Sequence, residues 1–423
     1  MSSIAIHNAH LISLRSNGDV WLAGTILLFS SGAFLSLLRS SESLSSGSRT
    51  GSIVTDLLWI GIYLFTLYCW HKNRQVIRNR LQLPWHIAAL YLVALASILW
   101  SDSPAATAPK LVALGGSLMI SCYLAMRFSA HSLLKILARV FLVSMVLSLL
   151  VGIFVPAVGI GSGDIAGMWQ GIYTHKNTLG LNMALAFAVF LAMATTHHGG
   201  KVYYLAAAFA ILLVLLSQSS TSLLLCLVIL VAYAARRLVR DYFRISVTLL
   251  MAMLAFLFTF DWEVALTKGL DLVNRDPTLT GRTDVWVASI IASEHLWLGY
   301  GYGAFWRGAD GPSFTVWKLV NWEAFYSHNG FLDVWLDLGF VGLGIVVMGI
   351  AISFRSALLR WKIHPLPENL WHVLFILYLV ASNLTEGTLL GINVLSWILY
   401  VAISIQLRDG NHRGIAIPER TAS

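Results

Sequence analysis

The sequence predicts an all-α integral membrane protein, and composition, apolar runs and charge placement all predict this class. Hydrophobic residues make up 57% of the 423 residues, whereas charged residues make up only 11%. This balance is typical of chains embedded in a bilayer. About 12 apolar stretches follow one another, most of them long enough to cross a hydrocarbon core of roughly 30 Å as helices. Lys and Arg gather in alternate loops, as expected of a chain that crosses a membrane repeatedly.

The expected transmembrane helices follow directly from the apolar runs. Residues 1–423 are then expected to form a single polytopic membrane domain, because the sequence leaves no soluble segment long enough to fold alone. In order, the helices are placed at Val20–Leu38, Ile53–Trp70, Pro84–Trp100, Lys110–Met126, Leu133–Val155, Thr178–Ala194, Val202–Leu216, Ser220–Ala235, Ile245–Phe260, Phe331–Phe354, Leu370–Ser382 and Gly391–Gln406.

The first apolar stretch has a feature of a secretory signal, since the Ser-rich run Ser40–Ser48 follows it. A signal core usually contains only about 7 to 15 apolar residues, and this stretch is longer. We therefore expect a retained membrane anchor. Cys69, Cys122 and Cys226 all fall inside apolar stretches, so we interpret them as buried small hydrophobic residues without a disulfide or metal role.

Basic residues predict the orientation of the chain, because short cytoplasmic loops carry an excess of Lys and Arg. With both termini cytoplasmic, most of the 28 basic residues fall on the inner side. Basic flanks at an anionic inner leaflet explain the net charge of +8 without a nucleic acid partner. The inner groups include Lys72/Arg74/Arg78/Arg80, Arg127/Lys135/Arg139, Arg236/Arg237/Arg240/Arg244, Arg355/Arg360/Lys362 and Arg408/Arg413/Arg420.

The longest outer loop, residues 261–327 between the ninth and tenth spans, is predicted to be a folded lid. Loops beyond about 12 to 15 residues in a compact protein are usually functional or disordered. Disordered segments contain few aromatic residues, whereas this loop contains repeated tryptophans from Trp262 to Trp322, so we expect it to be folded. A short helix over Thr283–Glu294 would place Trp286, Ile290, Ser293 and Trp297 on one side, which suits a segment lying on the membrane interface.

Three outer segments contain residues that could carry chemistry, and the first is His175-Lys176-Asn177. A cation near a helix N-terminus gains nothing from the helix dipole. Lys176 could instead offer a compact positive charge to a phosphate, with backbone N–H groups of the helix start as further donors. The alternative is a lysine that extends to lipid headgroups at the interface.

The second segment is Gly281-Arg282-Thr283-Asp284, at the start of the expected lid helix, with Thr280, Thr283 or Asp284 as its cap. The guanidinium of Arg282 and the first helix amides could share one anion, such as a diphosphate. The alternative is a local ion pair of Arg282 with Asp284 or Asp276.

The third segment, His328-Asn329-Gly330, directly precedes the tenth span. A neutral imidazole there could accept a proton from a hydroxyl nucleophile. The alternative is a simple headgroup contact. Asp333 and Asp337 follow one helical turn apart, and we expect them to face the bundle interior or water and to brace the histidine.

These segments, in this order and spacing, resemble the O-antigen polymerase and ligase superfamily, most closely its exopolysaccharide polymerase branch. Each motif alone is weak, but together with Trp100-Ser101-Asp102 they cover most of the chain. The strings that carry the resemblance are Trp169-Gln170-Gly171-Ile172-Tyr173-Thr174-His175-Lys176-Asn177-Thr178-Leu179-Gly180, Gly281-Arg282-Thr283-Asp284-Val285-Trp286, Gly299-Tyr300-Gly301-Tyr302-Gly303-Ala304-Phe305-Trp306 and His328-Asn329-Gly330-Phe331-Leu332-Asp333.

The resemblance implies a glycosyltransferase of the C class (GT-C) in the bacterial inner membrane, with its active site on the periplasmic side. Its donor would be an undecaprenyl-diphosphate-linked oligosaccharide and its acceptor a glycan. It implies that Arg282 binds the diphosphate, that Lys176 is a second phosphate contact and that His328 orients or deprotonates the acceptor hydroxyl. His175, Asn177 and Asn329 would assist in binding. Proteins that control chain length or export are expected partners.

The Phe305-Trp306 pair could stack on a sugar ring, which makes Arg307 and Trp306 further substrate-binding candidates. No acidic cluster suited to Mg²⁺ or Mn²⁺ is evident in the sequence, so we expect neither a metal nor another cofactor. Two other functions remain open. A ligase would use the same donor, although the resemblance describes ligases with arginine where this chain has Lys176. A transporter or flippase would require charges near mid-membrane, and the central parts of the spans are nearly free of them.

Overall fold

The computed structural model describes residues 17–35, 53–72, 74, 81–196, 200–236 and 281–413. Within these residues the structure is helical, apart from an isolated antiparallel bridge between Ile160 and Trp169. This confirms the predicted all-α class for the described part of the chain. Every predicted transmembrane stretch that falls in these ranges overlaps an α-helix, whereas Ile245–Phe260 lies outside the described residues.

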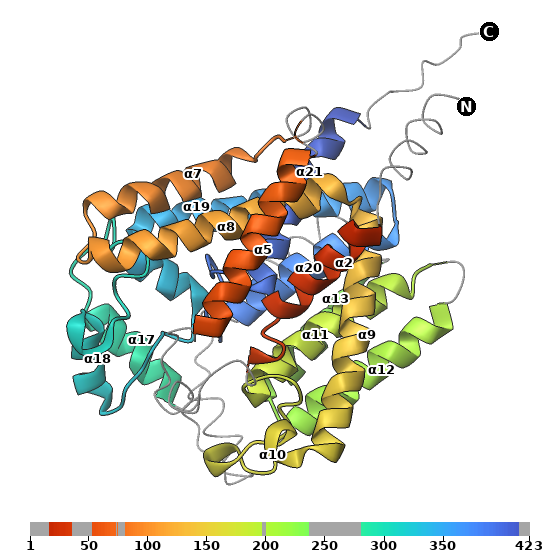
Figure 1. Cartoon of the computed structure of the whole chain (residues 1–423), viewed down its shortest axis with the longest axis horizontal. Coiled ribbons are helices and arrows are strands. Elements are labelled where there is room, and N and C mark those ends of the chain that lie inside the picture. The colour runs from red at the N-terminus through yellow and green to blue at the C-terminus, as the bar shows by residue number, and fades with distance from the viewer. Residues whose placement is uncertain are drawn as a thin grey trace. The chain divides into compact units, whose positions relative to one another are not determined.

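Six helices of the described ranges are long and apolar enough to cross a membrane. This finding agrees with an integral membrane protein, as the composition predicts. The six are α5 (Ile53–Lys72), α8 (Pro104–Arg127), α9 (Ala130–Phe154), α11 (Lys176–Met193), α12 (Gly200–Ser217) and α19 (Gly330–Ile363) (Figure 1).

The described residues form two compact units, and the division between them falls within α8 and α13 (Ser220–Ala234). One unit comprises the described residues before Gln82 together with those between Met119 and Cys226. The other comprises Gln82–Leu118 and the described residues from Leu227 onward.

In the first unit, α11 is the central helix. It packs against α9 and α12, and α2 (Asn17–Ser30) packs against α9 (Figure 1). Close packing requires small residues, because a side chain at Gly180 would lie 2.4 Å from the hydroxyl of Ser222. Buried Asp19 of α2 accepts a hydrogen bond of 2.8 Å from the phenol of Tyr123 and forms an ion pair with Arg127.

In the second unit, α19 packs against α7 (Trp85–Ala96), α20 (Pro367–Asn383) and α21 (Leu395–Arg413) (Figure 1). Residues 281–327 are folded around two short helices, α17 (Arg282–Ile291) and α18 (Ser313–Val320). Their buried apolar cluster also includes residues of the Gly-Tyr-Gly segment and of α19. The short helix predicted over Thr283–Glu294 is therefore present, with its bounds at Arg282 and Ile291.

Helix α19 contains a break at Gly339, where φ is 63° and ψ is −165°. The predicted Phe331–Phe354 helix did not include this break. A Cβ on Gly339 would lie 2.1 Å from the carbonyl carbon of Trp297, so the backbone of residues 281–327 directly contacts the backbone of α19 there. Only glycine fits both this conformation and this contact.

Candidate active site

Arg282 is the first residue of α17, and its side chain is buried against the turn that follows α20. One guanidinium nitrogen, Nη1, donates to the carbonyl of Thr385 at 2.6 Å. The other, Nη2, donates to Glu386 Oε1 at 3.0 Å and forms an ion pair with it. The sequence had suggested Asp284 or Asp276 as the ion partner. In the described residues the partner is Glu386, and Asp276 lies outside them.

Among the described residues, no side chain caps the start of α17. Gly281 precedes the helix in the left-handed conformation, with φ of 76°. The sequence had offered Thr283, Asp284 or Thr280 as a cap, and Thr280 lies outside the described residues. The first backbone N–H groups of a helix lack intrahelical acceptors, so this end can receive an anion beside Arg282.

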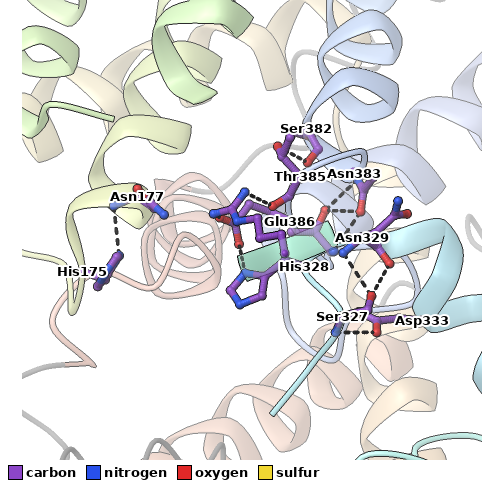
Figure 2. A network of polar contacts seen from close by, with 12 residues as sticks. His175, Asn177, Ser327, His328, Asn329, Asp333, Ser382, Asn383, Thr385 and Glu386 are labelled. Atoms are coloured by element: carbon purple, nitrogen blue, oxygen red, sulfur yellow. Dashed lines mark hydrogen bonds and ion pairs between the residues drawn. The ribbon is translucent and has the colours of Figure 1, made fainter. Parts of the chain in front are cut away.

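His328 faces the same carboxylate. Its Nδ1 lies 3.8 Å from Glu386 Oε2, and Figure 2 shows the two side chains close together. This distance exceeds a hydrogen bond but keeps the two groups within strong electrostatic reach. Glu386 therefore lies between two residues that the sequence assigned separately, with one carboxylate oxygen toward each of them.

The backbone of His328 is held in a strained conformation. Its φ of 56° is uncommon for a residue other than glycine. The ring of Tyr326 packs against the imidazole, with ring centroids 4.0 Å apart. Non-glycine residues held in such conformations cluster at functional sites, where the surrounding structure maintains them.

Hydrogen bonds fix the chain on both sides of His328 (Figure 2). The indole of Trp286 donates to the carbonyl of Ser327 at 2.8 Å. The hydroxyl of Ser327 donates to the carbonyl of Asn329 at 2.8 Å and accepts from its N–H at 3.0 Å. The Asn329 side chain caps α19 by accepting from Phe331 and Leu332 N–H at 3.0 and 3.2 Å. The sequence assigned Asn329 to substrate binding, and the structure shows it as a helix cap.

Asp333 braces the histidine turn, as the sequence suggested. Its Oδ1 accepts from the N–H of Ser327 at 3.1 Å and from the indole of Trp306 at 2.9 Å. A side chain on Gly387 would lie 2.3 Å from the other carboxylate oxygen of Asp333. The turn that carries Glu386 and the turn that carries His328 are thus in close contact through Asp333.

Asn383 holds the Glu386 turn in shape. Its side-chain oxygen accepts from the N–H groups of Thr388 and Leu389 at 2.8 and 3.0 Å, while its amide nitrogen donates to the Leu379 carbonyl at 2.8 Å. A Cβ on Gly330 would lie 2.1 Å from the same side-chain oxygen. The glycine of the His-Asn-Gly motif is therefore required for close packing against this turn.

The Gly-Tyr-Gly segment is packed tightly against other elements. A Cβ on Gly303 would lie 2.4 Å from the side chain of Lys110, which donates to the Gly303 carbonyl. The phenol of Tyr302 donates to the carbonyl of Leu390 at 2.6 Å. Phe305 is fully buried, which leaves Trp306 and Arg307, both partly buried, as the accessible residues of the Phe-Trp-Arg run.

His175-Lys176-Asn177 lies in the first unit, at the start of α11. His175 precedes the helix, and its Nδ1 accepts a hydrogen bond of 3.2 Å from the Asn177 N–H, so the helix begins at Lys176. Arg282 and His328 belong to the second unit. The convergence of Lys176 with them stays a prediction.

The motifs of the sequence did not select Glu386 as a site residue. One signal was present: an ionisable side chain just after an apolar span is costly unless it is paired or functional. The identity of its partners depends on contacts between distant parts of the chain, which no local pattern contains. Lys110 was counted as the start of a span, and its contact with Gly303 was not foreseen.

Comparison with known proteins agrees with the motifs. The family described as O-antigen ligase matches residues 205–347. Exopolysaccharide production protein ExoQ of Rhizobium meliloti (strain 1021) is 31% identical over 100 residues, which are 22% of this chain and 23% of that protein. The predicted resemblance to the O-antigen polymerase and ligase superfamily, and to an exopolysaccharide protein, is thereby confirmed.

A solved structure, a chain of a peptidoglycan synthase complex described as coordinating polymerization and crosslinking, is also similar. The match covers 79% of this chain and 98% of that chain, with 18% identity and a TM-score of 0.40. At this level the likeness carries no argument about fold or activity.

Proposed function

From the resemblance to the O-antigen polymerase and ligase superfamily, we propose that this chain is a membrane glycosyltransferase that polymerises undecaprenyl-diphosphate-linked oligosaccharide repeats. The reaction takes place on the periplasmic face of the bacterial inner membrane, within one polytopic domain of the GT-C type. The observation that carries the proposal is the position of Glu386 between Arg282 and His328, two residues that separate motifs select.

Arg282 binds the diphosphate of the donor in this proposal. The two hydrogen bonds to Thr385 and Glu386 use two of the five N–H donors of its guanidinium. The uncapped start of α17 supplies backbone N–H groups beside it. Negative charge develops on the diphosphate as the sugar departs, so a cation fixed beside it lowers the barrier. Two opposite charges about 4 Å apart interact by roughly 4 kcal/mol at an intermediate dielectric constant.

His328 receives the proton of the acceptor hydroxyl. With Nδ1 buried and facing Glu386, the imidazole would carry its proton there and present Nε2 as the acceptor. Glu386 then stabilises the imidazolium that forms. The acceptor oxygen bonds to the anomeric carbon, and the bond from that carbon to the diphosphate oxygen breaks, with its electron pair leaving on undecaprenyl diphosphate. This single displacement inverts the anomeric carbon and requires no metal.

Lys176 is the second phosphate contact in this proposal. His175 and Asn177 shape the start of α11 around it. Trp306 and Arg307 bind sugar hydroxyls or the ring face, and Asn329 acts near the acceptor. A lysine provides a compact charge and no planar fork, so it suits one phosphate oxygen better than two.

A ligase is the second candidate, because it uses the same donor and transfers the glycan to lipid A-core or another acceptor. The family that matches residues 205–347 is described as O-antigen ligase, whereas the similar Rhizobium protein is named for exopolysaccharide production. Lys176, in the place where ligases are described with arginine, favours the polymerase. A transporter or flippase is less compatible with the Arg282, Glu386 and His328 arrangement at one end of α17, α19 and α20.

The size of the lipid-linked glycans in a deletion strain tests the proposal. Loss of a polymerase should leave single repeats on undecaprenyl diphosphate, because no repeats are joined. Loss of a ligase should leave long lipid-linked chains without their final attachment. Extraction and size analysis of this pool separates the two, and an unchanged pool would exclude both. Complementation with the unaltered gene is the matched control.

A further inference from the structure

The outer loop pairs its backbone with the break in α19. The N–H groups of Tyr300 and Gly301 donate to the carbonyls of Leu336 and Asp337, both at 2.9 Å. In the other direction, the N–H groups that follow Gly339 donate to the loop, from Phe340 to the Leu296 carbonyl at 2.9 Å and from Val341 to the Trp297 carbonyl at 3.2 Å. The hydrogen bonds that the helix loses at its break are replaced by bonds to residues 296–301.

This pairing fixes the depth of the loop segment in the membrane. Arg355 is the first basic residue at the inner end of α19, and a basic side chain there marks the inner edge of the hydrocarbon core. Gly339 lies about 24 Å further out along the helix, at a rise of about 1.5 Å per residue. Because the hydrocarbon core is about 30 Å thick, the break and the paired loop lie just inside its outer boundary.

The loop presents an apolar surface at this depth. Leu296, Trp297 and Leu298 are exposed, and Trp297 is 71% exposed although it is one of the largest apolar side chains. Residues with exposed apolar side chains also lie on α17, and they are Val287, Ile290 and Ile291. The opposite face of α17, with Arg282, Val285, Ala288 and Ser289, is buried.

This surface is continuous with the outward face of a membrane-spanning helix. The ring of Trp297 contacts the ring of Phe340 in an edge-on arrangement, with centroids 5.6 Å apart, and Phe340 is itself 47% exposed. From Phe340 toward the C-terminal end of α19, the exposed apolar residues continue at helical spacing, through Val341, Val347, Met348 and Ile352. A patch that extends an exposed apolar stripe of a transmembrane helix faces the same surroundings as that stripe.

We propose that Val287, Ile290, Ile291 and Leu296–Leu298 form a lipid-facing edge that inserts into the acyl chains of the outer leaflet. Irregular backbone is tolerated at that depth only when its polar groups are bonded within the protein. The carbonyls of the edge meet this condition: α19 takes up those of Leu296 and Trp297, and the indole of Trp100 donates to that of Leu298 at 3.0 Å. Tryptophan is also the side chain enriched at membrane boundaries.

Two polar neighbours set the limit of insertion. His295 and Asp102 lie next to the edge, with His295 Nε2 3.7 Å from Asp102 Oδ1, and both are partly exposed. They require water or headgroups, so the edge reaches the outermost acyl carbons and no deeper. Helix α17 is about 15 Å long, and the inserted edge therefore holds Arg282 within one short helix length of the membrane surface. The inference rests on the membrane orientation and on this packing, and the proposed chemistry is not needed for it.

Nitroxide accessibility tests the edge directly. The full-length chain with C69A, C122A and C226A is reconstituted in vesicles of phosphatidylethanolamine and phosphatidylglycerol, and single cysteines are spin-labelled at Ile290→Cys and Trp297→Cys. Two positions calibrate the measurement: Val347→Cys, which faces lipid on α19, and Asp310→Cys, an exposed polar position of the same loop. The ratio of collision rates with O₂ and with a water-soluble nickel chelate is the readout.

A ratio at Ile290 and Trp297 several-fold above that at Asp310, and close to that at Val347, supports insertion. Ratios equal to that at Asp310 would overturn it, because they place the edge in water. Low accessibility to both reagents, or spin–spin broadening between labels, would also overturn it, because a protein surface or a second copy then covers the edge. The label at Ile290 remains informative if loss of Trp297 disturbs the break. Normal glycan products accompanied by water-like ratios would leave the proposed function intact and refute the edge alone.

Discussion

At the scale of single residues, Glu386 links the described parts of the candidate site. Its two carboxylate oxygens face Arg282 and His328, and the side chains of Arg282 and Glu386 are both about nine-tenths buried. A buried charge that loses its partner is strongly destabilising. Much of the order around the site should therefore depend on this one carboxylate.

Replacement of Glu386 tests that dependence. Glu386→Gln keeps the shape and one acceptor but removes the charge, leaving Arg282 buried without a counter-ion. We expect a loss of about 3 to 5 kcal/mol in the stability of this region and a large loss of product. Thermal unfolding of the purified protein measures the first effect. Glu323→Gln, at an exposed carboxylate within residues 281–327, is the control and should leave the melting temperature unchanged.

Arg282 is expected to be essential for product formation. Arg282→Ala removes a charge interaction worth roughly 4 kcal/mol, which corresponds to several hundredfold or more in rate if it acts in the transition state. Arg282→Lys should restore only part of the activity, since the planar fork is lost. Polymer yield at equal protein abundance is the measurement, with Lys318→Ala as a control for the loss of an exposed cation of the loop. Near-normal polymer from Arg282→Ala would refute the diphosphate role.

His328→Ala should slow turnover by about 100- to 10,000-fold, the usual range for a general base, while the donor still binds. Donor binding is measured by retention of radiolabelled lipid-linked oligosaccharide on the purified protein, and turnover by the rate of chain growth. If the variant no longer binds donor, His328 belongs to the donor site and its assignment as the acceptor base is wrong.

At the scale of elements, helix positions were predictable and their interruptions were not. The apolar runs located α19 to within one residue at its N-terminal end, at Gly330 compared with the predicted Phe331. Its C-terminal end, at Ile363, lies well beyond the predicted Phe354, because the helix continues through the basic residues that follow the apolar run. The break at Gly339 depends on contacts with the irregular segment 296–301, which lies about 40 residues earlier in the chain. Hydrophobic periodicity is a local pattern and does not report such a non-local contact.

Gly339→Ala should disrupt this partnership. The conformation of Gly339 is open essentially to glycine alone, and enforcing it on another residue costs about 1 to 3 kcal/mol. The added methyl group would also meet the Trp297 backbone at 2.1 Å. Gly344→Ala is a matched control on the same helix, because no atom lies within 4 Å of its Cβ position. We expect a lower melting temperature and less polymer for Gly339→Ala only. Equal behaviour of the two variants would show that the break is dispensable.

The turn between α20 and α21 shows a second limit of sequence reasoning. The predicted last helix began at Gly391, but α21 begins at Leu395 because the intervening turn is extended and well bonded. Leu390 and Asn393 both have positive φ, and the Ser117 hydroxyl accepts from the Asn393 N–H at 2.8 Å. Leucine is an unusual choice for that conformation, whereas asparagine tolerates it, so turn propensities gave a sign of this turn only at Asn393.

At the scale of the whole molecule, composition and charge placement were enough to predict the class, and motif order was enough to predict the family resemblance. Neither could supply the ion pair between Arg282 and Glu386, because these two residues lie about a hundred positions apart, at the start of α17 and after the end of α20. Hydrophobic periodicity reports which residues face lipid or core, and it contains no information on which polar groups meet. The meeting of Lys176 with the other two residues stays a prediction for the same reason.

If protein cations alone neutralise the leaving group, a metal chelator should not change the rate of the reaction. If Arg282 and Lys176 neutralise the departing diphosphate, then EDTA should leave the rate of chain growth in reconstituted vesicles unchanged, and added Mg²⁺ or Mn²⁺ should not raise it. A nucleotide-sugar glycosyltransferase that depends on Mn²⁺ serves as the positive control for chelation. A loss of activity that Mg²⁺ restores would contradict the proposed mechanism.

The shared hydrogen bonds at Gly339 also constrain biogenesis. The ribosome delivers residues 296–301 before it delivers α19, so these residues leave the ribosome before the carbonyls and N–H groups with which they pair. The N-terminal half of α19 and residues 296–301 can acquire their final register only after the helix itself has been synthesised. The final arrangement around His328 therefore cannot precede completion of α19.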